Sequence, residues 1–101
     1  MEINKILEGN KLIIELSGQL NTTTSPSLDE EINTSVTNDI TDLVFDFKDL
    51  TYVSSAGLRV ILISHQKMTG KGGTFTIINV CDDIKEVFNM TGFSTILNIE
   101  D

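Results

Sequence analysis

A short apolar run near the middle of the chain, LVFDF at residues 43–47, constrains the fold more than any other segment. Its residues favour β-strands and only one of them is polar, which is typical of a strand that is buried on both faces. Segments with helical periodicity lie before and after it. A strand between two helices implies crossover connections, so the run is expected to be a central strand of a largely parallel sheet.

The N-terminal part of the chain predicts a hairpin followed by a helix. Residues 3–7 and 11–17 favour strands, and the Gly9-Asn10 pair between them suits a tight antiparallel turn. Further on, Ser25 is expected to be the N-cap of a helix of about three turns, with Pro26 at its first position. The hairpin adds an antiparallel pair, so the predicted sheet is mixed.

The C-terminal part repeats the alternation of helix and strand. Residues 56–69 are expected to form a helix that the glycines at 70–73 end, and residues 74–80 a strand. Asp82 or Asp83 is expected to cap a short helix that ends at Gly92, and residues 95–99 form a last strand or a docked tail. The prediction is one α/β domain over residues 1–101, in the order ββαβαβα with a possible final short strand.

Charge and composition exclude several classes of function. The net charge of −8 disfavours nucleic acid and anionic membrane surfaces, and it suits solubility or a basic protein partner. Cys81 is the one cysteine, so it forms no internal disulfide and no metal site, and it is expected to be buried. Because no segment resembles a signal peptide or a membrane span, we expect a cytoplasmic protein.

Two serines, Ser54 and Ser55, stand where the central strand gives way to a helix, at the edge of the sheet where functional sites gather. They lack the G-x-S-x-G pattern of a hydrolase. The only histidine, His65, would lie about 15 Å along the helix, beyond reach of either hydroxyl, and its neighbours place it at the edge of the core. We therefore expect no catalytic residue, no metal and no cofactor.

Two interpretations of the serines remain open. One of them can cap the helix that starts near Ala56, with its hydroxyl accepting a backbone N–H. Alternatively, a serine here can be phosphorylated, because a helix N-terminus tolerates a phosphate while the new charge alters the surface. On the same helix, Val60 is expected to pack against a neighbouring helix, whereas Arg59 and Ile63 can belong to a face that docks a partner.

Three stretches in order identify a family. They are LSGQLNTTTSPSL at residues 16–28, DLTYVSSAGLRVILISHQKMTGKGG at 49–73 and VFNMTGFSTILNI at 87–99. Together they resemble the anti-sigma factor antagonists of the bacterial STAS-domain family. The resemblance covers essentially the whole chain and implies a mixed sheet with helices packed on one side.

The resemblance also implies a function. Such a protein is not an enzyme; it binds an anti-sigma factor, usually a serine kinase, and so releases a sigma factor that directs transcription. The kinase phosphorylates the antagonist, here on Ser55 with Ser54 as the rival site, and a serine phosphatase reverses the reaction. Ser54 and Asn21 stand where many members carry Asp. The implied partner-binding residues are Asn21, Thr22, Ser54, Ser55, Ala56, Gly57, Arg59 and Ile63.

An alternative function needs no phosphorylation. The domain can be a STAS scaffold, either in a signalling assembly or as the partner subunit of a lipid transporter. An enzyme or a carrier of a small ligand has the least support, because no acid–base pair emerges from the sequence.

Overall fold

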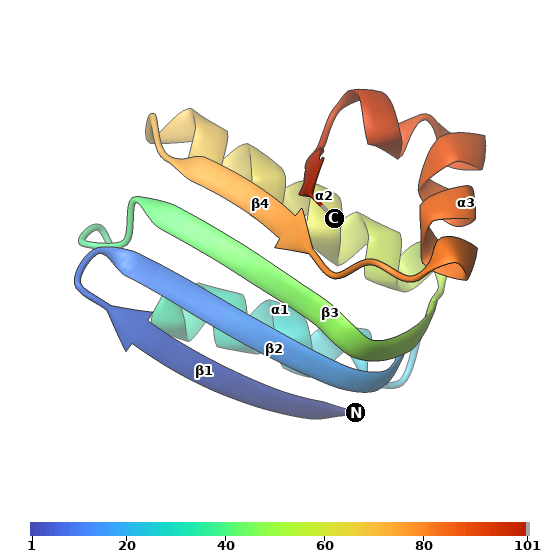
Figure 1. Cartoon of the computed structure of the whole chain (residues 1–101). Coiled ribbons are helices and arrows are strands. Elements are labelled where there is room, and N and C mark those ends of the chain that lie inside the picture. The colour runs from blue at the N-terminus through green and yellow to red at the C-terminus, as the bar shows by residue number, and fades with distance from the viewer. Residues whose placement is uncertain (101) are drawn as a thin grey trace.

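The structure, a computed structural model, describes residues 1–100 as a five-stranded mixed sheet with three α-helices (Figure 1). This confirms the predicted fold class and element order, including the final short strand. The elements in chain order are β1 (Glu2–Glu8), β2 (Lys11–Leu20), α1 (Ser25–Ser35), β3 (Asp42–Val53), α2 (Ser55–Gly70), β4 (Thr74–Ile78), α3 (Asp82–Thr91), the 3₁₀ helix η1 (Phe93–Thr95) and β5 (Asn98–Glu100).

The strands lie side by side in the order of the sequence, β1-β2-β3-β4-β5. β1 runs antiparallel to β2 across the Gly9-Asn10 turn, and the other pairs are parallel. Each crossover moves in the same direction along the sheet, and right-handed crossovers of this kind place their helices on one face. Figure 1 shows α1 and α2 behind the sheet, and α3 near the end at which the parallel strands finish.

The core lies between the sheet and these helices. Alternate residues of β2 are buried while those between them are partly exposed on the uncovered face, as the two-residue period of a strand requires. Phe45 and Phe75 meet edge to face, with ring centroids 4.8 Å apart. The largest fully buried side chains are Phe45, Phe47, Phe88, Ile14, Leu16, Leu20, Leu28, Ile32, Leu43, Leu50, Ile61 and Met68.

The central strand β3 was predicted correctly in place but is longer than the apolar run at residues 43–47. It continues to Val53 through two irregularities. Glu15 of β2 lies opposite Asp46 whereas Ser17 lies opposite Asp49, and a second shift follows between Gly18 and Gln19. Each leaves an extra residue on β3, as in a β-bulge, and together they hide the two-residue alternation from the sequence. As a result the strand ends directly before Ser54.

The predicted N-caps of α1 and α3 are wrong, because each observed N-cap lies before the predicted residues. Helix α1 begins at Ser25 with Thr24 at the N-cap, because the Ser25 N–H and hydroxyl both donate to the Asn21 carbonyl, at 2.8 and 2.5 Å. Helix α3 begins at Asp82, with Cys81 at the N-cap. Asp82 and Asp83 instead occupy the first turn of α3, where the helix dipole favours negative charge.

The prediction that Cys81 is buried is also wrong. It follows the end of β4 and its side chain is exposed. The prediction for His65 is confirmed, since its ring is half-buried beside Phe75 with centroids 6.3 Å apart. Within residues 1–100 no helix combines the length and the apolar character needed to cross a membrane.

Candidate functional site

Ser54 is built into the start of α2. Its N–H donates to the Leu20 carbonyl at 2.8 Å, which ties the end of β3 to the end of β2. Its hydroxyl accepts the Gly57 N–H at 3.2 Å, and its backbone is extended, with φ −88° and ψ 175°. These are the features of an N-cap residue, so the capping interpretation holds for Ser54.

Ser55 differs from its neighbour in its position and in its contacts. It is the first residue of α2 and is exposed. Among the described residues its hydroxyl has no hydrogen-bond partner. The first turn of a helix also presents backbone N–H groups without intrahelical partners, and these carry partial positive charge. The Ser55 hydroxyl is therefore free, accessible and in a setting that favours a negatively charged group.

Gly57 explains why the serines sit where they do. A Cβ atom at this position would lie 2.8 Å from Leu20 Cγ and 2.9 Å from the Leu20 carbonyl oxygen. Such distances leave no room for a side chain, so only glycine lets α2 begin this close to β2. Gly57 is buried, and it contributes to the surface by holding the first turn of α2 in place.

A second loop, residues 21–24, lies beside the serines. The Asn21 carboxamide oxygen accepts the N–H groups of Thr23 and Thr24 at 3.0 and 3.1 Å. The Thr24 hydroxyl accepts the Asn21 N–H at 2.8 Å and donates to the Gln19 carbonyl at 2.8 Å. This network fixes the loop and leaves Thr22 exposed. The bond between Leu20 and Ser54 holds the two loops together.

A groove of about 330 Å³ runs between the N-terminal halves of α1 and α2. Val60 is buried in its wall, which confirms that it packs toward the neighbouring helix, whereas Arg59 and Ile63 are exposed. Three lining residues on α1, Ser25, Pro26 and Asp29, were not among the predicted site residues. Asp29 lies four residues after Ser25 and three after Pro26, and this spacing was a usable signal because it places the three residues on one face of a helix. The groove is lined by Thr22, Ser25, Pro26, Asp29, Ala56, Arg59, Val60 and Ile63.

Arg59, which shares the groove lining with Asp29, is a positive charge that suits an anion at Ser55. Arg59 lies four residues after Ser55 and so on the same side of α2. Among the described residues Arg59 forms no ion pair. His65 lies ten residues beyond Ser55 in the sequence. Within residues 1–100, no group of three or more His, Cys, Asp or Glu side chains is arranged to hold a metal ion. The arrangement favours addition of a charged group to the hydroxyl or contact with a partner.

Comparison with known sequences finds STAS domains and anti-sigma factor antagonists. The family model of the STAS domain matches residues 2–101. The candidate anti-sigma factor antagonist BtrV of Bordetella bronchiseptica is 31% identical over 88 residues, which cover 87% of this chain and 76% of that protein. The anti-sigma F factor antagonist of Paenibacillus polymyxa is 29% identical over 91 residues, 89% of this chain and 78% of that protein.

Solved structures share the fold at lower sequence identity. A candidate anti-sigma factor antagonist from Thermotoga maritima matches with a TM-score of 0.89 and 16% identity, over 98% of this chain and 86% of that one. The anti-sigma factor antagonist SpoIIAA matches in its unphosphorylated form with a TM-score of 0.79 and 17% identity, over 99% and 88% of the two chains. The phosphorylated form of the Bacillus protein SpoIIAA gives 0.78 and 17%, over 99% and 92%.

Proposed function

This chain belongs to the STAS domain family, and from that membership we propose that it is an anti-sigma factor antagonist. In this function it acts by binding. It occupies an anti-sigma factor, which then releases the sigma factor that it had sequestered. The surface that we assign to the contact consists of the two loops and the groove beside them, with Asn21, Thr22, Ser54, Ser55, Ala56, Arg59 and Ile63 at or near the protein surface and Gly57 supporting them.

Phosphorylation of Ser55 is the proposed switch. The observation that carries it is the contrast between the serines: the Ser54 hydroxyl is used as a cap, while the Ser55 hydroxyl is exposed and has no partner in the described part of the chain. A phosphate on Ser55 gains from the helix N-terminus without removing an existing hydrogen bond. A phosphate on Ser54 would instead place its charge on the capping oxygen.

The magnitude of the charge effect is sufficient for a switch. Phosphorylation adds about −1.5 to −2 charges at pH 7. Repulsion between unit charges about 4 Å apart reaches ~4 kcal/mol at an intermediate dielectric, before screening by salt. A micromolar complex has only about 8 kcal/mol of binding free energy, so a loss of about 3 kcal/mol weakens it by more than a hundredfold. No refolding of the domain is needed.

The proposal implies two enzymes as partners and a location. The anti-sigma factor is a serine kinase that uses ATP to modify the chain, and a serine phosphatase restores the free hydroxyl. The chain itself carries out no reaction. Because the sigma factor, the anti-sigma factor kinase and ATP must be present together, the protein works in the cytoplasm.

Intact-mass measurement tests the assignment of the site. The chain is incubated with ATP and the anti-sigma factor kinase encoded nearest to its gene. We expect a gain of about 80 Da, one phosphate, for the native chain and for Ser54→Ala, and no gain for Ser55→Ala. Labelling of Ser55→Ala would refute the site. Unmodified protein that still binds the kinase would instead favour the scaffold function without phosphorylation.

A further inference from the structure

The edge strand β1 is separated by β2 from β3, the strand that leads to the serines, and it is unusual in its exposed apolar residues. The side chains of Leu7 and Ile6 are 66% and 38% exposed, on opposite faces of the strand. Beside Leu7 a groove of about 430 Å³ runs between the hairpin and the C-terminal end of α1, with the buried residues Leu12 and Ile40 in its lining. An edge strand also presents unpaired backbone groups, so it can accept a further strand.

The charges on β1 decide which strand it accepts. Glu2 and Glu8 stand at its two ends, and Lys5 stands at its centre. In a two-fold antiparallel pair of two copies over the full strand, Glu2 faces Glu8 at both ends and Lys5 faces Lys5. Like charges directly opposite each other are destabilising in a sheet. The order of charges therefore disfavours a second copy of this chain.

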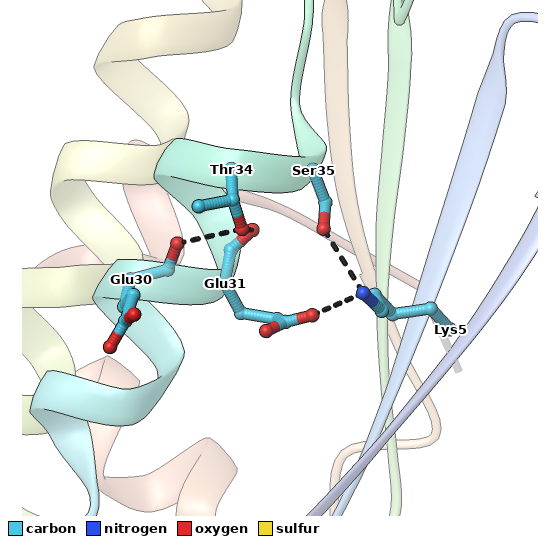
Figure 2. Close-up of polar contacts among 5 residues, drawn as sticks. All are labelled: Lys5, Glu30, Glu31, Thr34 and Ser35. Atoms are coloured by element: carbon cyan, nitrogen blue, oxygen red, sulfur yellow. Dashed lines mark hydrogen bonds and ion pairs between the residues drawn. The ribbon is translucent and has the colours of Figure 1, made fainter.

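The Lys5 side chain also points toward the helices of its own molecule. It pairs with Ile14 in the register of β1 and β2, so it lies on the face that the helices cover. Figure 2 shows its amino group reaching α1, where it contacts the Glu31 carboxylate and the Ser35 hydroxyl, the latter at 3.3 Å. This contact covers the middle of β1 from the helix side. Glu2 and Glu8, at the two ends, form no ion pair within residues 1–100, although Lys11 of β2 stands opposite Glu8 in the register.

We propose that β1 is a second interaction surface, which binds an extended segment of a partner with basic residues at both ends and an apolar residue against Leu7. The partner strand adds antiparallel to β1, its basic residues face Glu2 and Glu8, and its apolar side chain enters the groove beside Leu12. This surface uses none of the residues assigned to the Ser55 site, so the two proposals can be tested separately.

The test uses the full chain and two synthetic peptides of the same apolar pattern. The basic peptide Lys-Leu-Val-Thr-Thr-Val-Lys places its charges opposite Glu8 and Glu2 in antiparallel pairing, and Glu-Leu-Val-Thr-Thr-Val-Glu is the matched control. Amide NMR spectra are recorded at millimolar peptide. We expect shifts in residues 2–8 with the basic peptide, an affinity about tenfold above that of the control, and weakening in about 0.5 M salt.

Charge reversal sharpens the test. In the double variant Glu2→Lys with Glu8→Lys the preference between the two peptides should invert, whereas Glu30→Lys, an exposed change on α1, should leave it unchanged. The single variant Glu8→Lys should gain concentration-dependent dimerisation by light scattering, because opposite charges then meet at both ends of the self-pair. Equal response to both peptides, shifts confined to residues outside β1 and the groove beside Leu12, or dimerisation of the native chain through β1 would each overturn the proposal.

Discussion

Ser54 and Ser55 are neighbours in the chain, but within residues 1–100 only the Ser54 side chain hydrogen-bonds to the surrounding backbone. The Ser54 hydroxyl accepts the Gly57 N–H, and its own N–H binds the Leu20 carbonyl. Ser55 is exposed and begins the helix. The local structure thus separates a residue that stabilises the fold from one that is free to be modified.

Alanine substitutions should separate these two roles by stability. Ser54→Ala removes the cap and should lower the free energy of unfolding by about 1 kcal/mol, which corresponds to a fall in Tm of about 4–8 °C for a domain of this size. Ser55→Ala should change it by less than about 0.5 kcal/mol. Thermal unfolding followed by circular dichroism measures both. A larger loss for Ser55→Ala would show that Ser55 is the structural cap.

Gly57 provides a second prediction, because one of its close neighbours, the Leu20 carbonyl oxygen, belongs to the backbone of β2 and cannot move away easily. In Gly57→Ala the new Cβ meets the Leu20 side chain and the Leu20 carbonyl oxygen. We expect a loss of about 1–3 kcal/mol in the free energy of unfolding and displaced amide resonances at residues 20–24 and 54–58. Gly70→Ala is the matched control, since a Cβ at Gly70 meets nothing within 4 Å. Equal stability of the two variants would contradict the close approach of α2 to β2.

At the level of elements, periodicity and turn chemistry predicted the order of strands and helices but not their ends. The strand at residues 43–47 was recognisable from its apolar run, whereas its continuation to Val53 includes the polar residues Lys48, Asp49 and Thr51 behind a bulge. Such a stretch has neither the strict alternation nor the apolar run that identifies a strand. The cap of α1 lies one residue before the predicted one because the Ser25 N–H and hydroxyl bind the Asn21 carbonyl, a local contact that residue type alone does not reveal.

Substitutions in the groove between α1 and α2 should distinguish residues that pack in the core from residues that contact a partner. Val60 is 7% exposed and Ile63 is 38% exposed, although both belong to the lining. Val60→Ala should cost about 1–2 kcal/mol of stability. Ile63→Ala should cost less than about 0.5 kcal/mol but weaken binding to the anti-sigma factor by about tenfold or more.

Paired measurements of Tm and of Kd by calorimetry check both variants of the groove. Native affinity in Ile63→Ala, with its stability unchanged, would place the contact elsewhere on the surface.

On the scale of the whole molecule, the site depends on contacts between distant segments, which limits what the sequence can reveal. The pattern around residues 54–58 pointed to the serines and to Arg59. The role of Gly57 could not be predicted without the fold, because it depends on Leu20, which is far from it in sequence. The exposure of Cys81 likewise depends on where β4 ends relative to β3. Residue types and local spacing indicated the chemistry, and the topology determined the neighbours.

The most direct test compares the affinity of the anti-sigma factor for the bare chain and for the chain carrying phosphoserine at position 55. With Tm measured on both forms, we predict a Kd at least about a hundredfold higher for the phosphorylated chain and a Tm within about 4 °C of the bare chain. Equal affinity of the two forms, within about threefold, would contradict a switch based on surface charge. Loss of binding together with unfolding would contradict the claim that the architecture tolerates the phosphate.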